Sequence, residues 1–359
     1  MDNDRNNLNT HKLMYHPDRV SEWLLTGDTI PIYVEVSPSI RCNAHCKFCA
    51  YGSADRKVGR LEEDKFTGVY LSNALPGMQK LGVRSVMFCG EGEPLMNENI
   101  VGMVTETADA GIDVSVTSNG IRIWSARTII AYLKWIKFSI DAGTAETYSG
   151  IKGIPSRIYE KLLTDIESVC SVEKKFRTTL KGGGCTIGAQ MVVVPENYME
   201  VTLLAEWCKK AGVDYLALKP FTPSDYTTTK FDKIEYGKII EFLDEVVPSI
   251  DYNVIYRKNA FSAVHEKECT SVCRALPFWM YISSNGDIYP CLSCYGYPDY
   301  VLGNLFTDDI VDIWESDRRL EIYKKIEEGR EHCRLGCRMT EVNKYLEAIS
   351  NPPDHVNFI

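Results

Sequence analysis

Strand-like and helix-like segments alternate six times between residues 31 and 248, and this alternation constrains the fold most strongly. Apolar, β-branched runs predict buried strands, and a segment with helical periodicity follows each of them. The runs lie at 31–37, 83–89, 112–117, 135–140, 186–194 and 214–219. The pattern predicts an α/β fold with a parallel sheet. We expect a partial, TIM-like (β/α)6 barrel, with a doubly wound open sheet as the alternative.

The remaining sequence suggests two further parts. The predicted boundaries are 1–30 for an N-terminal extension with a short helix, 31–248 for the barrel and 249–359 for a C-terminal region. That C-terminal region holds six of the thirteen cysteines of the chain, between Cys269 and Cys337. Its apolar runs on either side of Asn285-Gly286 predict a β-hairpin.

Composition excludes several classes of protein. Forty basic and forty-nine acidic residues give a net charge of −9, which argues against binding to nucleic acid or to an anionic membrane. No apolar run approaches the roughly 18 residues of a membrane span, and the polar N-terminus does not resemble a signal peptide. We therefore expect a cytoplasmic protein. In that reducing compartment, cysteines are more often metal ligands or catalytic groups than disulfides.

Three cysteines follow the first predicted strand. Cys42, Cys46 and Cys49 have the spacing C-x3-C-x2-C on one short loop. Three thiolates can supply three of the four ligands of a cubane iron–sulfur cluster and leave one iron open. A structural zinc site is the alternative, with His45 as its nearest further ligand.

Polar residues also follow the other predicted strands, where the carboxyl ends of parallel strands place functional groups. In chain order these candidates are Gly90-Glu91-Gly92-Glu93, Ser118, Asn119, Ser139, Asp141, Gln190, Lys219 and Asp225. For any one of them, turn or cap chemistry is the competing interpretation.

The cysteine loop resembles the signature of radical S-adenosylmethionine (SAM) enzymes, with Phe48 before the third cysteine. The resemblance extends over roughly residues 31–340. It implies that Cys42, Cys46 and Cys49 hold a [4Fe–4S] cluster whose open iron binds the amine and carboxylate of SAM. It further implies that the reduced cluster cleaves SAM to methionine and a 5′-deoxyadenosyl radical, which abstracts hydrogen from a substrate.

The resemblance also implies roles at the strand ends. Gly92 and Glu93 match the family's GGE motif, which receives the SAM ammonium group, although Glu91 stands where a glycine is usual. The positions that match contacts to the SAM ribose and carboxylate are Ser118, Asn119, Ser139 and Asp141. Gln190 matches a polar position that relatives direct at SAM or substrate.

The C-terminal cysteines resemble a SPASM/twitch region, which binds auxiliary clusters. Because few cysteines follow Cys291, the truncated twitch form is expected, with one auxiliary [4Fe–4S] cluster. Its implied ligands are Cys273, Cys291, Cys333 and Cys337. Cys269 and Cys294 are left over, either to replace one of the four or to pack in the core. A zinc knuckle is the alternative for this region.

These features predict a radical SAM oxidoreductase that acts on a small polar substrate such as a sugar, cyclitol or nucleotide. A two-electron oxidation is expected, with Lys219 as substrate anchor, Asp225 as general base and a flavodoxin- or ferredoxin-type electron donor. The same chemistry on a peptide or protein side chain is one alternative. Redox-neutral epimerisation is another, with Cys185 or Cys294 returning a hydrogen. A zinc-stabilised binding protein without redox chemistry is the most distant alternative.

Overall fold

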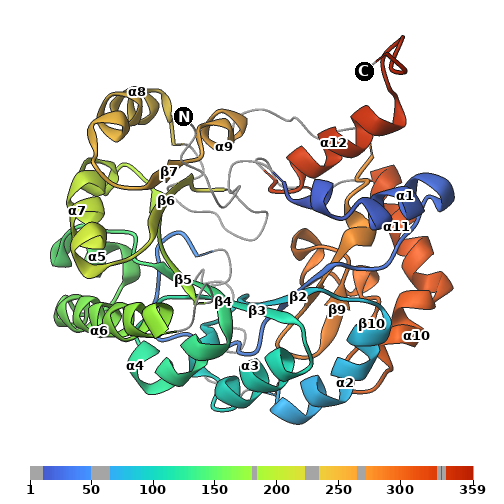
Figure 1. Ribbon diagram of the computed structural model, residues 1–359, viewed down its shortest axis with the longest axis horizontal. Coiled ribbons are helices and arrows are strands. Elements are labelled where there is room, and N and C mark those ends of the chain that lie inside the picture. The colour runs from blue at the N-terminus through green and yellow to red at the C-terminus, as the bar shows by residue number, and fades with distance from the viewer. Residues whose placement is uncertain are drawn as a thin grey trace.

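The computed structural model describes residues 11–49, 65–179, 184–222, 234–264, 272–329, 333 and 337–358 (Figure 1). One ten-stranded sheet runs through these residues in the order β10-β9-β8-β1-β2-β3-β4-β5-β6-β7. Its strands are β1 Tyr33–Val36, β2 Ser85–Phe88, β3 Asp113–Ser118, β4 Leu133–Ser139, β5 Thr186–Val193, β6 Tyr215–Pro220, β7 Val254–Tyr256, β8 Trp279–Ile282, β9 Asp287–Tyr289 and β10 Gly303–Asn304. Strands β1 to β7 neighbour one another in chain order, as in a barrel and unlike a doubly wound sheet.

Helices cover the outside of this curved sheet, and α2 to α8 lie around it (Figure 1). Their bounds are α1 Pro17–Thr26, α2 Gly68–Lys80, α3 Ile100–Asp109, α4 Ile123–Ala126, α5 Ala145–Lys152, α6 Arg157–Thr179, α7 Val201–Ala211, α8 Gly237–Val246, α9 Lys258–Ala263, α10 Ile310–Glu315, α11 Asp317–Gly329 and α12 Thr340–Ser350. The predicted α/β class and partial barrel are confirmed.

The parallel part of the sheet has eight strands, two more than the six that the alternation predicts. Strand β7 pairs with β6, and β8 pairs in parallel with β1, with Tyr33 opposite Trp279. Strand β8 is also the first strand of the predicted hairpin, since it pairs antiparallel with β9. It covers a backbone edge of β1 that would otherwise be unpaired. The sheet thus crosses the predicted boundary between residues 248 and 249, which stays a prediction.

The two faces of the parallel strands differ in chemistry. The face toward the helices is aliphatic, with fully or nearly fully buried side chains such as Val34, Val86, Val116, Ile136, Ile187 and Leu216. The strand register places a polar and aromatic set on the opposite, inner face, which includes Tyr33, Glu35, Met87, Thr117, Lys137, Gln190, Lys219 and Trp279. Successive side chains of a strand point to opposite faces. The barrel interior is therefore lined differently from the packed core around it.

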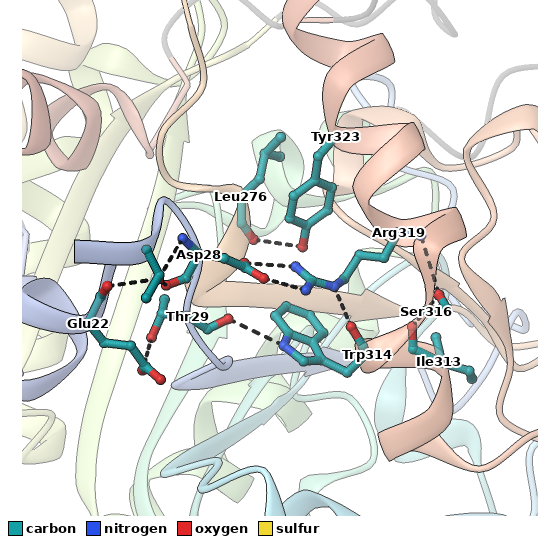
Figure 2. A network of polar contacts seen from close by, with 10 residues as sticks. Glu22, Asp28, Thr29, Leu276, Ile313, Trp314, Ser316, Arg319 and Tyr323 are labelled. Carbon is teal, nitrogen blue, oxygen red and sulfur yellow. Dashed lines mark hydrogen bonds and ion pairs between the residues drawn. The ribbon is translucent and has the colours of Figure 1, made fainter. Parts of the chain in front are cut away.

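A polar clamp fixes the C-terminal helices to the segment before β1 (Figure 2). The buried guanidinium of Arg319 binds both carboxylate oxygens of Asp28, at 2.9 and 2.5 Å. Its Nε donates to the backbone oxygen of Trp314, whose indole Nε1 donates to the backbone oxygen of Thr29 at 3.3 Å. A paired fork of this kind fixes orientation as well as distance. The clamp thereby sets α11 against the start of β1.

Candidate functional site

The cysteine loop begins where β1 ends, as predicted, and the end of α5 supports it. The backbone N–H groups of His45 and Lys47 donate to the carbonyl oxygens of Lys152 and Ile151, at 2.7 and 2.9 Å. A Cβ at Gly153, which has a φ of +64°, would lie 2.8 Å from the His45 oxygen. Helix α5 therefore ends in a backbone surface on which the loop rests.

The three thiols of this loop interact electrostatically with one another. The pKa of Cys42 is raised to about 12, chiefly by burial and also by the charges of Glu93 and the other two cysteines. Burial also raises the pKa of Cys46, which Lys152 opposes. A thiolate at these positions needs compensating positive charge, which bound iron provides. The described residues contain no three His, Cys, Asp or Glu side chains grouped around a single ion. In a cubane, by contrast, each thiolate binds a different iron, and the donor set fits such a cluster.

Two glycines let the segment after β2 lie directly against the cysteine loop. A Cβ at Gly92 would lie 2.4 Å from the carbonyl oxygen of Arg41, and one at Gly90 would lie 2.3 Å from the Cβ of Ser37. Gly90 also has a φ of +129°, which strongly favours glycine. The backbone N–H of Glu93 donates to Arg41 at 2.8 Å.

Glu93, Ser118 and Asn119, three of the predicted SAM-binding residues, form one network. Oε1 of Glu93 accepts from the Ser118 hydroxyl at 2.7 Å, and Oε2 accepts from the backbone N–H of Asn119 at 2.7 Å. The Asn119 side chain reaches back to the cysteine loop, donating to Asn43 Oδ1 at 2.7 Å. Burial raises the pKa of Glu93, and these donors oppose the rise. A carboxylate has about four acceptor positions, so Oε2 retains capacity for an ammonium group.

Asp141 lies at the edge of the same site, but its carboxylate is already bound. Oδ2 pairs with Lys152 Nζ at 2.5 Å, and Oδ1 accepts from the backbone N–H of Val192 at 2.7 Å. Both side chains are almost fully buried. Burial alone lowers the pKa of Lys152, but the charges of Asp141 and Cys46 outweigh it and raise the pKa above its usual value. A role for Asp141 toward SAM stays a prediction, and its observed partner is Lys152.

Other predicted residues lie on or beside the inner face. Ser139 and Gln190 are directly opposite each other on β4 and β5, and the Gln190 side chain is buried. Lys219 lies near the carboxyl end of β6, and its pKa falls to about 8, chiefly through burial and also through the positive charge of Arg257. Asp225 lies outside the described residues.

The cysteines predicted for the auxiliary cluster come from separate segments. Cys273 interacts electrostatically with Cys291 and Cys337, and its Sγ accepts from the Asn343 amide at 3.6 Å. Cys294 lies beside Cys291, and a hydrogen bond between their thiols lowers the pKa of Cys291 while raising that of Cys294. Cys294 also interacts with Cys333. Cys294 is thus a fifth cysteine of this group, whereas Cys269 lies outside the described residues.

Cys185, proposed from the sequence as a hydrogen donor, lies far from this edge of the sheet. It immediately precedes β5, whereas the cysteine loop follows the carboxyl end of the parallel strand β1. Its backbone N–H donates to Glu173 Oε1 at 2.6 Å. Of the two cysteines considered as hydrogen donors, Cys294 is the one that lies near the predicted ligands of the auxiliary cluster.

Several residues of the site were not predicted from the sequence. Lys152 and Lys137 were missed, as was the pair formed by Glu35 and Arg338. Glu35 and Lys137 each interrupt an apolar strand at an inward position, and that interruption was a usable signal. Arg338 carried no such signal, because it meets β1 only through the tertiary fold.

Two protein-family models match the chain. The radical SAM superfamily model matches residues 36–208, and the SPASM iron–sulfur cluster-binding domain matches residues 273–338. With this fold and this cysteine loop, the chain belongs to the radical SAM superfamily and carries a SPASM-type domain. It is accordingly a radical SAM enzyme, and membership implies SAM, a [4Fe–4S] cluster and auxiliary iron–sulfur binding as its cofactors.

Curated relatives and solved structures agree with this family. The chain is 23% identical over 315 residues to a tungsten-containing aldehyde ferredoxin oxidoreductase cofactor-modifying protein of Pyrococcus furiosus, covering 80% of this chain and 81% of that protein. It is 23% identical to an AdoMet-dependent heme synthase of Methanosarcina barkeri, covering 81% and 83%. SuiB of Streptococcus suis, solved with its precursor peptide SuiA, has the same fold, with a TM-score of 0.65 at 19% identity, covering 88% of this chain and 71% of SuiB.

No helix in the described part of the chain is both long and apolar enough to cross a membrane.

Proposed function

We propose that this enzyme oxidises a small polar substrate by two electrons after hydrogen abstraction. The observation that carries the proposal is the inner barrel face, which bears Lys137, Gln190 and Lys219 rather than a packed aliphatic core. Ligand sites need a few convergent polar groups of this kind. A sugar, cyclitol or nucleotide offers hydroxyl groups to match them.

The chain's own residues have separate tasks in this proposal. Cys42, Cys46 and Cys49 hold the first cluster, and Gly92 and Glu93 receive the SAM ammonium group. When bound and reduced, the cluster supplies the electron that cleaves SAM and so provides the 5′-deoxyadenosyl radical. Further proposed SAM or substrate contacts come from Ser118, Asn119, Ser139, Asp141 and Gln190. Lys219 anchors the substrate, and Asp225 accepts its proton.

The oxidation balances with the groups proposed here. An alcohol carbon loses a hydrogen atom, which leaves as part of 5′-deoxyadenosine, and then loses one electron and the hydroxyl proton to become a carbonyl. Cys273, Cys291, Cys333 and Cys337 would hold the auxiliary cluster, which would supply the acceptor for that electron, and Asp225 would take the proton. A flavodoxin- or ferredoxin-type donor supplies the electron that starts each turnover. The protein excludes water and oxygen from these steps.

Anaerobic reconstitution tests this proposal. We expect about eight irons per chain, since each cubane holds four, and 5′-deoxyadenosine that forms only with reductant. Bound zinc without deoxyadenosine would contradict the proposal and support a zinc-stabilised binding protein. With polyols, nucleotides and peptides as candidate substrates, a ketone product supports oxidation. A modified peptide or an inverted stereocentre supports one of the alternatives instead.

A further inference from the structure

Four cationic side chains meet at the inner face of the barrel, although the chain as a whole carries a charge of −9. They come from β4, β6, the residue after β7 and the segment before α12, and they are Lys137, Lys219, Arg257 and Arg338. The strand register places Lys137 and Lys219 on the same face, separated only by β5. The first three side chains are half-buried.

Within the described residues, the two carboxylates of this face, Glu35 and Asp141, already pair with Arg338 and Lys152. Glu35 binds Arg338, whose guanidinium lies 4.5 Å from the Trp279 ring and 5.6 Å from the Tyr33 ring. Asp141 also acts on Lys219, but its carboxylate is held by Lys152. Lys137 therefore faces Lys219 and Arg257, and in the described part of the chain it forms no ion pair with a carboxylate.

The protonation equilibria of the two lysines reflect this imbalance. The pKa of Lys137 is lowered to about 7, chiefly by burial and also by the charges of Lys219 and Arg257. Like charges brought together away from water are unfavourable, and an anion placed between them relieves the cost. A negatively charged ligand would therefore be stabilised at this face of the barrel.

Two buried polar atoms on the same face also lack a hydrogen-bond partner among the described residues. They are Oε2 of Glu35 and Nε1 of Trp279. The Glu35 side chain is only 1% exposed. Buried polar groups are nearly always satisfied, by protein, water or ligand. A ligand that brings a donor and an acceptor to this face would satisfy both.

We propose that the barrel interior binds a substrate with at least two negative charges, as phosphate or carboxylate groups, held between Lys137, Lys219 and Arg257, with a hydrogen-bond donor directed at Glu35. This inference rests on the proposed function, since it names the class of substrate for the same site. It narrows the small polar substrates to anionic ones. Neutral sugars and cyclitols are excluded, and phosphorylated or carboxylated compounds remain.

Calorimetric titration of the anaerobic, cluster-loaded, SAM-bound enzyme tests the inference. Pyrophosphate and citrate serve as the probes for phosphate and carboxylate groups, and myo-inositol serves as the neutral polyol. We expect one of the two anions to bind, with an affinity that falls as the salt concentration is raised. Inositol should not bind. Lys137→Gln and Lys219→Gln should each weaken binding by about tenfold, as loss of one close charge contact implies. Lys137→Arg should retain binding.

Lys238→Gln is the matched control, because Lys238 is an exposed lysine on the outer helix α8. It should bind the anion like the wild type. The Lys137→Gln variant should also keep the iron content and thermal stability of the wild type, since the substitution relieves repulsion. Loss of both would instead indicate a purely structural role for Lys137. The inference would be overturned if K137Q and K238Q lost affinity for the anion equally, or if the wild type bound no anion. Wild-type enzyme that forms deoxyadenosine but binds neither anion would overturn only this inference, whereas absence of deoxyadenosine would overturn the proposed function.

Discussion

The hydroxyl of Tyr281 donates a 2.9 Å hydrogen bond to Oε1 of Glu91, although the two residues are 190 positions apart. Oε2 of the same carboxylate accepts from the Ser37 hydroxyl and, at 3.3 Å, from the backbone N–H of Ser284. Glu91 therefore joins the segment after β2 to β1 and to the β8–β9 hairpin. The residue that departs from the family's GGE motif links the proposed SAM-binding segment to the SPASM-type domain.

Glu91→Gln should make the stability of the enzyme less dependent on pH. Burial raises the pKa of Glu91 to about 7 from a usual 4.5, against the effect of its hydrogen bonds. Folding then takes up a proton between these two values, so stability falls as pH rises from about 4.5 to 7 and is level above. The rise corresponds to roughly 3 kcal/mol. Relative to the wild type, the variant should gain apparent Tm between pH 5 and pH 8, measured anaerobically.

Glu98→Gln provides the control, because Glu98 is an exposed acid on the same segment. Its pH profile should match that of the wild type. A Glu91→Gln profile that also matches the wild type would show that the Glu91 carboxylate is ionised throughout this range.

Lys152→Met should destabilise the enzyme by roughly 3–5 kcal/mol, because it leaves the buried Asp141 carboxylate unpaired. The cysteine loop rests on the backbone at Lys152, so iron content should fall as well. Lys161→Met is the control, since its pair with Asp165 has a lysine that is 64% exposed and should cost about 1 kcal/mol or less. Denaturant titration and iron analysis check both variants, and equal costs would contradict the assignment.

Alanine variants of the cysteines should separate the two cluster sites. Cys42→Ala, Cys46→Ala or Cys49→Ala should each remove about four irons per chain and abolish deoxyadenosine. Cys273→Ala or Cys291→Ala should lower iron by a similar amount and leave reductive SAM cleavage measurable. Cys208→Ala, a buried cysteine of α7, should retain all the iron. Iron analysis of Cys294→Ala then decides whether this residue is a cluster ligand. A full iron content in C42A would contradict the assignment of Cys42 to the first cluster.

Arg319→Lys should loosen the C-terminal helices, because an ammonium group cannot reproduce the paired contacts to Asp28. We expect a loss of about 2 kcal/mol or more, with loss of auxiliary iron before that of the first cluster. Lys325→Gln breaks an exposed pair with Asp299 and should cost less than about 1 kcal/mol. Thermal unfolding and iron analysis test this, and equal effects of the two variants would contradict it.

Local patterns predicted much of the fold. The six strand-and-helix units and the hairpin around Asn285-Gly286 are confirmed because periodicity and turn residues encode them locally. The pairing of β8 with β1 was not predicted, since a register between Tyr33 and Trp279 depends on tertiary packing. Helix α5, which supports the cysteine loop, was also missed, although Thr144 caps its start and the left-handed Gly153 ends it, and both are local signals.

For the candidate site, the sequence predicted which residues lie there better than it predicted which side chains they contact. Glu93, Ser118 and Asn119 were expected at one edge of the sheet, and the structure brings them together. For Asp141 the sequence indicated a polar strand end but not its buried cation, because nothing in the local sequence marks Lys152 as its partner. Ionic partners of this kind become visible only when separate elements are packed.

The position of β8 also has a consequence for how the protein is made. Because β1 obtains one of its two neighbours from β8, it remains an edge strand until β8 has left the ribosome, long after β2 has done so. Pairings between such distant segments form slowly and expose partly folded barrels to aggregation. The loop that holds the first cluster follows β1, so the cluster site is not fully supported until β8 has paired with β1.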